Sequence, residues 1–340
     1  MWCDPRDGIQ GQGYDRGSPP AREHVTGTMN ESVMTATATT SPEATRIPIA
    51  ASLMALGSGV VWSFGAVTAR LAKHADAFQY LIWRSVGVLV VMEAMTAIRR
   101  QPMLLPKAYR SGKWMLSADF GLLLASLTFV YAVKTTTAAN ASFLGSVTPL
   151  AAVVLARLVL GERLSRVTLG ALIVAFIGLI VTVFGDLHAG NMAGNIAALT
   201  ASVGFAIYTI SVRSNPDADW SPVLSGYAAA MIVLCSVITI ANGKTLFPPA
   251  KDMAYALGHG AVFIVVGTML FNRGSKRVPA VPMTVLAQTE MVFVPLWAFL
   301  VLSEAPKAAT VVGGAIIFAA VVGKAVLDTA PGAVQPVQEY

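Results

Sequence analysis

The chain has 340 residues, of which 55% are hydrophobic and only 12% charged; its net charge is +6 and its mean hydropathy is +0.64. Soluble domains carry about 25% charged residues, so this composition excludes an ordinary soluble domain. The apolar residues form long continuous runs, which match membrane-spanning helices and not the short alternating segments of a β-barrel. The predicted fold class is therefore all-α, in a polytopic membrane protein.

The first residues differ in kind from the rest of the chain. Residues 1–46 are rich in Gly, Pro, Ser, Thr and Arg and contain no apolar run long enough for a span or a signal peptide. We expect a disordered cytoplasmic tail here, with Met29 or Met34 as alternative starts to Met1. Residues 329–340 are expected to form a second, short cytoplasmic tail.

Ten apolar runs follow in chain order. Five lie in the first half, near residues 49–70, 77–98, 113–133, 136–157 and 166–184. Five lie in the second half, near residues 194–213, 219–241, 253–272, 279–302 and 309–327. The fourth and the eighth are the weakest, because ANASFLGSVTP and GTMLFNRGSKRVPA mix polar and small residues into the run. The connections leave no room for a soluble domain, so we predict one membrane unit of ten transmembrane helices.

The positions of Lys and Arg predict the orientation, because cytoplasmic loops retain basic residues. An even number of spans puts both termini on one side. With the N-terminus inside, the cytoplasmic side receives most of the 24 basic residues. The outer side receives a smaller set: Arg70, Lys73, Lys134, Lys244, Lys251 and Lys307. We expect both termini in the cytoplasm; loop topology explains the net charge, so no nucleic acid partner is predicted.

An internal repeat divides the apolar region into two halves. Shifts of 142 and 143 residues superpose several residues of the two halves: Ala138 on Ala280, Glu162 on Glu304, Arg70 on Arg213, and Asp76 on Asp219. Because each predicted half has five helices, the second half enters the membrane from the opposite side, which makes the repeat inverted. Residues 47–186 and 187–328 are the predicted repeats. The alternative is that hydrophobic helices resemble one another by composition alone.

Two segments of these halves resemble a known family. SFLGSVTPLAAVVLARLVLGERLSRVTLGALIVAFIGLIV is similar to the end of an EamA domain, and VLAQTEMVFVPLWAFLVLSEAPKAATVVGGAIIFAAVVG is similar to a second copy. The resemblance covers residues 49–327. It implies the drug/metabolite transporter superfamily, with ten helices, two EamA repeats, a central substrate cavity and, commonly, export of amino acids or other metabolites. The second copy departs from the first at Met291, which replaces Pro149, and this leaves the substrate open.

Several residues of the two segments are interpreted as structural. Glu162 and Glu304 fall at helix boundaries, where a carboxylate suits a helix N-terminus or a loop. Pro149 and Pro295 lie within predicted spans and are expected to kink helices or to create break points that line the cavity. Close helix packing is expected at four small residues: Gly170, Gly178, Gly313 and Gly314.

Two ionisable residues lie near the middle of predicted spans, where a charge costs several kcal/mol unless it faces a cavity or a partner. Arg84 is interpreted either as an anion-binding residue or as one half of an internal ion pair. Glu290, beside Gln288, is a candidate to bind a substrate amine or to carry a proton that couples transport. An internal hydrogen bond is the alternative for Glu290. Together, the two charges suit a zwitterion.

Other candidates for substrate binding are aromatic and polar, because ligand cavities combine apolar walls with a few polar anchors. They are Trp62, Tyr131, Asn140, Tyr208 and Trp297, each of which can instead face lipid or pack. Glu93 and Asp119 lie closer to the cytoplasmic ends of their spans. We expect water to reach these two carboxylates.

Other classes of function find little support. The histidines are scattered, there is no Walker loop, and Cys3 and Cys235 provide neither a zinc site nor a disulfide, so no enzyme activity, cofactor or metal is predicted. The predicted function is a secondary active or facilitative transporter that exports small metabolites, such as amino acids or drug-like solutes, across the inner membrane by alternating access. A channel or a non-transporting scaffold is the alternative. The predicted partners are a small solute and the lipid bilayer, with a homodimer as an open question.

Overall fold

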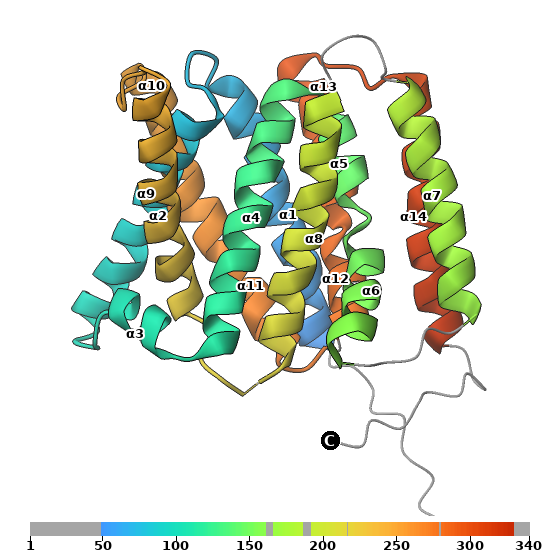
Figure 1. Cartoon of the computed structure of the whole chain (residues 1–340), viewed down its shortest axis with the longest axis horizontal. Coiled ribbons are helices and arrows are strands. Elements are labelled where there is room, and N and C mark those ends of the chain that lie inside the picture. The colour runs from blue at the N-terminus through green and yellow to red at the C-terminus, as the bar shows by residue number, and fades with distance from the viewer. Residues whose placement is uncertain (1–48, 161–165, 186–191, 216, 279, 330–340) are drawn as a thin grey trace, which may run out of the picture. The chain divides into compact units, whose positions relative to one another are not determined.

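The computed structural model describes residues 49–160, 166–185, 192–215, 217–278 and 280–329, within the compact unit 47–340. The first half contains α1 (Ile49–Leu71), α2 (Ala77–Ile98), α3 (Leu104–Arg110), α4 (Lys113–Thr135), α5 (Ala138–Gly145), α6 (Thr148–Leu160) and α7 (Arg166–Gly185). The second contains α8 (Met192–Arg213), α9 (Pro222–Ala241), α10 (Ala250–Gly258), the π-helix η2 (His259–Ile264), α11 (Val265–Ser275), α12 (Ala280–Ala287), α13 (Thr289–Leu302) and α14 (Ala308–Thr329). No strand occurs in these ranges, which confirms the all-α class (Figure 1).

Seven helical segments are long and apolar enough to cross a membrane, by length and composition. They are residues 49–71, 77–98, 113–135, 138–155, 192–213, 222–241 and 250–275. Shorter apolar stretches lie in α7, α13 and α14. This is the composition of a multi-pass membrane protein, but these lengths do not establish the predicted count of ten spans.

Two predicted continuous spans are interrupted. The expected helix 136–157 consists of α5 and α6, with a break at residues 146–147, and the expected helix 279–302 consists of α12 and α13, with a break at Gln288. Pro149 is the second residue of α6, and its missing N–H is harmless in the first turn of a helix. Pro295 lies inside α13, so the second break is not at this proline. The repeat shift of 142 places Ser146 on Gln288, so the two breaks are equivalent.

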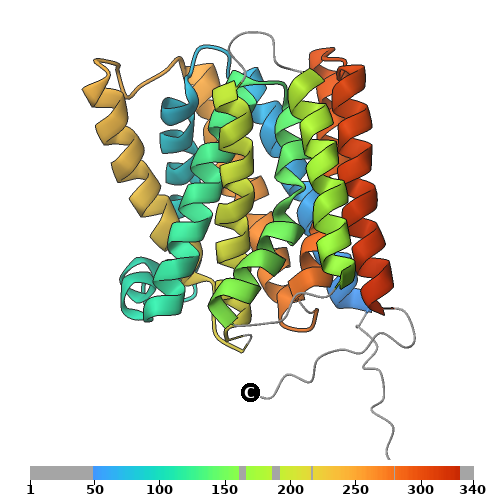
Figure 2. The same cartoon turned by 45° about the vertical axis from the view of Figure 1, so that its right-hand side comes forward.

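Helix packing follows a two-fold pattern between the halves. The first helix of each half packs against the third span of the other, α1 against α11 and α8 against α4. The first helices also contact the broken helices of the opposite half, while α2 packs against its equivalent α9, and α7 against its equivalent α14 (Figures 1 and 2). The α1–α2 loop lies at the upper edge of Figure 1 and the equivalent α8–α9 loop at the lower edge. Equivalent loops at opposite edges are what an inverted repeat requires.

Two ion pairs outside the spans repeat this symmetry. Asp76, the N-cap of α2, lies 2.8 Å from Lys244, and Asp219, just before α9, lies 2.7 Å from Lys107 of α3. Burial alone would raise the pKa of both carboxyl groups, but hydrogen bonds from the lysines and from backbone N–H groups outweigh burial, so both pKa values are lowered. Each pair is partly exposed and is worth at most about 1 kcal/mol.

The predicted packing glycines behave differently from one another. A Cβ on Gly178 would lie 2.7 Å from the carbonyl oxygen of Gly313, and a Cβ on Gly314 would lie 2.4 Å from the ring of Phe143. These contacts confirm close packing of α7 on α14 and of α14 on α5. Gly170 is exposed with nothing within 4 Å of its Cβ position, so the prediction for Gly170 is wrong.

Gly204 of α8 lies at a close approach in the α4–α8 contact. A Cβ there would lie 2.6 Å from the backbone nitrogen of Ala125 and 2.8 Å from the carbonyl oxygen of Gly121, and a backbone cannot rotate away. We expect Gly204→Ala to lower the free energy of unfolding in detergent by about 1–3 kcal/mol through overpacking. Gly170→Ala is the matched control, with no loss expected. Equal stability of the two variants would contradict the tight crossing.

The two carboxylates expected to meet water have different surroundings in the structure. Glu93 accepts hydrogen bonds from the backbone N–H groups of Leu104 and Leu105, at 3.1 and 2.9 Å, and so holds the start of α3. Asp119 is only 6% exposed and lies under Gly226, whose Cβ would be 2.5 Å from both carboxylate oxygens. The prediction that water reaches Asp119 is wrong, because α9 covers it.

Candidate functional site

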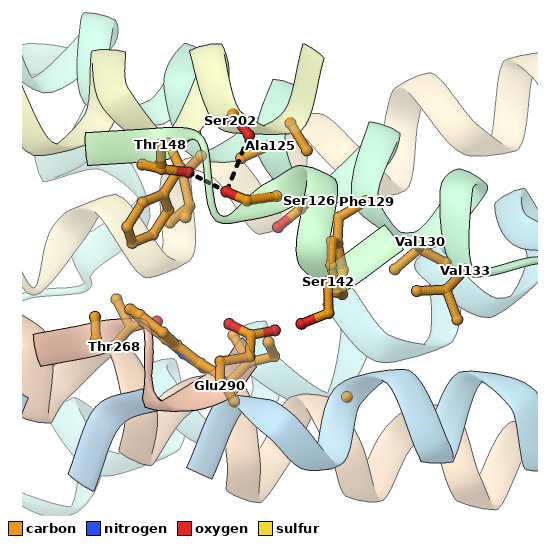
Figure 3. A pocket seen from close by; sticks show the side chains of 18 of the residues that line it. Ala125, Ser126, Phe129, Val130, Val133, Ser142, Thr148, Ser202, Thr268 and Glu290 are labelled. Atoms are coloured by element: carbon orange, nitrogen blue, oxygen red, sulfur yellow. Dashed lines mark hydrogen bonds between the residues drawn. The ribbon is translucent and has the colours of Figure 1, made fainter. Parts of the chain in front are cut away.

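A cavity of about 140 Å³ lies between the two halves of the protein. Its wall is formed by α1, α2, α4, α8, α9, η2 and α11, together with both helix breaks. Aromatic and aliphatic side chains form most of this wall, and hydroxyl groups are spaced around it: Ser126, Ser142, Thr148, Ser202 and Thr268 (Figure 3). The hydroxyl of Tyr227 also belongs to the wall. Apolar walls with a few polar groups are typical of a small-molecule site.

The helix breaks bring backbone and polar groups to the cavity. Gly145 ends α5, and its carbonyl oxygen accepts hydrogen bonds from Thr148 Oγ1 at 2.7 Å and Ser202 Oγ at 3.0 Å (Figure 3). At the second break, Thr289 Oγ1 donates to the carbonyl oxygen of Leu56 in α1 at 2.9 Å. Irregular backbone at membrane depth is tolerated where such bonds satisfy it or where it lines a cavity.

Arg84 of α2 lines the cavity and is only 2% exposed. Its Nε and Nη2 atoms have no hydrogen-bond partner in the described ranges, and no ion pair of Arg84 is found there. The internal ion pair considered for Arg84 is therefore not seen. A buried guanidinium with unpaired N–H groups is costly unless an anion occupies the space beside it.

Glu290 reaches the same cavity from the opposite half of the chain. It lies in the first turn of α13, directly after the second break, and its neighbour Gln288 also lines the cavity. Figure 3 shows its carboxylate pointing into the space that the Ser142 hydroxyl enters from the other side. Among the residues described, Glu290 has neither a hydrogen bond nor an ion pair, so the internal hydrogen bond considered as an alternative is not seen.

His259 is a residue of the cavity wall that the sequence did not single out. It is the first residue of η2, it is 3% exposed, and its Nδ1 lies 2.7 Å from the hydroxyl of Tyr80. Its position inside a predicted span was a usable signal, because the cost of an ionisable residue there applies to histidine as well as to Arg84 and Glu290.

The aromatic and amide candidates separate into one wall residue and four packing residues. Trp62 lines the cavity and packs against Phe205 and Phe271, with ring centroids 5.4 Å away in both cases. The other four are not among the residues that line this cavity: Tyr131, Asn140, Tyr208 and Trp297. Their polar groups and rings are used in packing between helices.

The contacts of these four candidates explain their positions. The Tyr208 hydroxyl donates to Asn272, the Asn140 amide donates to Asn195, and Trp297 Nε1 donates to Ser63 Oγ at 3.0 Å. The ring of Tyr131 packs near that of Phe78, with centroids 6.4 Å apart. A polar group buried in a membrane helix needs a partner, and a neighbouring helix supplies it here.

Glu304 connects the two halves at one edge of the bundle. Its Oε2 lies 2.9 Å from Nη2 of Arg70, and its Oε1 accepts a hydrogen bond from the backbone N–H of Ala138 at 3.1 Å. Ala138 is the first residue of α5, so the carboxylate lies at the N-terminus of a helix in the other repeat. Its repeat equivalent, Glu162, lies outside the described residues.

Removal of this carboxylate is expected to weaken the link between the halves. Glu304→Ala should lower the free energy of unfolding by about 1–2 kcal/mol, since it removes a half-buried ion pair and a bond to a helix N-terminus. Chemical unfolding in detergent measures the change. Asp219→Ala, at the more exposed Lys107 pair, is the control and should stay within about 0.5 kcal/mol of the wild type. A Glu304→Ala loss no larger than that of the control would refute the link.

Comparison with known proteins places this arrangement in a family. The model of the EamA-like transporter family matches residues 49–184 and 192–324. Two relatives are described as the pseudopaline exporter CntI, from Pseudomonas aeruginosa strains PAO1 and UCBPP-PA14. They are 24% and 23% identical over 243 residues, which is 71% of this chain and 78% of each relative. A crystal structure with 18% sequence identity has the same fold, with a TM-score of 0.60 and coverage of 83% of this chain and 99% of that chain.

The family match and the architecture agree. The two matched ranges correspond to the two halves that pack with two-fold symmetry around the cavity. Together they cover most of the chain. The protein therefore belongs to the EamA-like transporter family and contains two copies of its repeat.

Proposed function

We propose that the protein is a secondary transporter that exports compact zwitterionic metabolites, of about amino-acid size, across the inner membrane. The observation that carries this proposal is the placement of Arg84 and Glu290. They come from different repeats, line one cavity, and have no protein partner for their charged groups within the described ranges. A solute with a carboxylate and an ammonium group complements both charges.

The size of the cavity favours compact solutes over drug-like ones. Sites for drug-sized ligands usually enclose about 300–1,000 Å³. The cavity here has about 140 Å³. Spaced hydroxyl groups on its wall also suit a small polar solute. Of the two solute classes expected from the sequence, metabolites of amino-acid size are therefore the better fit.

Alternating access is supported by the symmetry of the fold. The two broken helices are equivalent, and both breaks lie at the cavity. A movement of one half against the other would therefore open the cavity to one side of the membrane and close it to the other. In this proposal the shorter apolar helices α7, α13 and α14 complete ten spans. The bias of Lys and Arg puts both termini in the cytoplasm. The exporter relatives favour outward transport.

Counterflow in proteoliposomes tests the proposal. We expect saturable exchange of at least one labelled amino acid from a panel of small, acidic, basic and aromatic members, and weaker exchange of larger drug-like cations. A channel would instead give conductance without saturable exchange, and a scaffold would give neither. Either of these results, with protein that is folded and inserted, would overturn the carrier function.

A further inference from the structure

His259 is held at the cavity wall by an irregular turn in its own helix. The run from α10 to α11 contains the π-helix η2, and π-turns of this kind occur frequently at functional sites. Gly260 allows η2 to approach α2 closely, because a Cβ there would lie 1.8 Å from the carbonyl oxygen of Arg84. This crossing keeps His259 next to Arg84 on the wall that both side chains line.

A chain of hydrogen bonds determines which ring nitrogen of His259 carries its hydrogen. Thr68 Oγ1 lies 3.0 Å from the carbonyl oxygens of Phe64 and Gly65, and a carbonyl oxygen can only accept. Thr68 therefore donates its hydrogen to the helix and accepts one from the Tyr80 hydroxyl at 2.9 Å. Tyr80 has no second hydrogen. Its oxygen is then placed to accept from Nδ1–H of His259 at 2.7 Å.

The other ring nitrogen, Nε2, is then a bare acceptor. It is buried without a hydrogen-bond partner in the described chain, and it lies 2.9 Å from the Cβ position of Gly65, another residue of the cavity wall. A buried acceptor that lacks a donor is costly, and a ligand donor would remove that cost. A second proton on the ring would instead place a cation beside the unpaired guanidinium of Arg84.

We propose that His259 determines specificity: its Nε2 accepts a hydrogen bond from an ammonium or hydroxyl group of a solute whose carboxylate binds Arg84. The charged groups that share this wall are Arg84 and Glu290, and its polar groups include the Gln288 amide and the hydroxyl of Tyr227. The inference rests on the proposed function and sharpens it. Carboxylic acids that carry a nearby amine or hydroxyl are selected over the same acids without one.

The tautomer is tested first, because it needs no solute. The full-length protein is labelled with 15N-histidine in lipid nanodiscs, and the His259 signal is identified by its loss in His259→Gln. If that variant does not fold, removal of His24, His74 and His188 one at a time identifies the signal by elimination. We expect the neutral Nδ1–H form at pH 7, and a shift toward Nε2–H in Tyr80→Phe. An Nε2–H form or an imidazolium in the wild type would overturn the proposal.

Solute choice is tested by equilibrium binding of L-alanine, L-lactate and propionate. We expect at least one of the first two to bind the wild type about tenfold or more tightly than propionate, and His259→Ala to reduce that preference about tenfold, the value of one hydrogen bond. His74→Asn is the control, since this side chain is 74% exposed. An unchanged preference in His259→Ala overturns the role of His259. Absence of binding by all three compounds instead counts against the proposed function, while the tautomer is decided separately.

Discussion

Replacement of Arg84 by glutamine is expected to weaken binding of carboxylate solutes about 100-fold, because two charge-assisted hydrogen bonds are lost and each is worth about 1.5 kcal/mol or more. The guanidinium is buried in the cavity wall with Nε and Nη2 unpaired in the described part of the chain. Equilibrium binding of a transported amino acid, together with the KM of its counterflow, measures the change. Stability should fall little, since no protein partner of the guanidinium is lost.

Two further variants separate charge from geometry at this position. Arg84→Lys keeps the charge but not the planar fork that matches a carboxylate, so we expect it to recover only part of the affinity. Arg273→Gln, on an exposed part of α11, is the matched control and should bind like the wild type. If Arg84→Gln unfolds more easily while the folded fraction binds normally, Arg84 stabilises the bundle and does not bind the anion.

Most of the architecture could be predicted from the sequence, because in a membrane protein hydrophobicity and repetition carry that information. Long apolar runs gave the helical class, and the shift that superposes Glu162 on Glu304 gave the two repeats. The same shift places Thr148 on Glu290, each at the start of a helix after a break. The repeat therefore already related the two sides of the cavity.

The helix breaks and the membership of the cavity wall were harder to predict. Polar residues lie beside both interruptions, at Thr148 and at Thr289 and Glu290, but the helices on either side are apolar enough for each pair to be taken as one span. The broken backbone at the first interruption is satisfied by side chains such as Ser202 from another helix. The position of an ionisable residue near the middle of a predicted span identified Arg84 and Glu290, since an unpaired charge there is costly. It could not show that Tyr208 and Asn140 face neighbouring helices, because their partners lie far away in the sequence.

Replacement of Glu290 by glutamine is expected to abolish uphill transport driven by a pH gradient. A proton moved through a gradient of one pH unit releases about 1.4 kcal/mol, enough for about tenfold accumulation of a coupled solute. Glutamine has similar size and polarity but cannot exchange a proton, so accumulation should fall to the value without a gradient. Counterflow at equal pH should persist with a higher KM for amines, because it needs no net proton movement but loses the charge that complements the solute ammonium group. Proteoliposomes with and without the gradient measure both quantities.

Asp119, another buried carboxyl group, provides the matched comparison. It lies under Gly226 between α4 and α9 and does not line the cavity, so Asp119→Asn should keep uphill transport. Coupling that is lost in Asp119→Asn and kept in Glu290→Gln would move the proton site from the cavity to the α4–α9 contact. If Glu290→Gln instead weakens binding of amines and not of hydroxy acids, with coupling unchanged, Glu290 binds the solute ammonium group alone. The proton would then travel by another route, and the two carboxyl groups would have separate roles in one cycle.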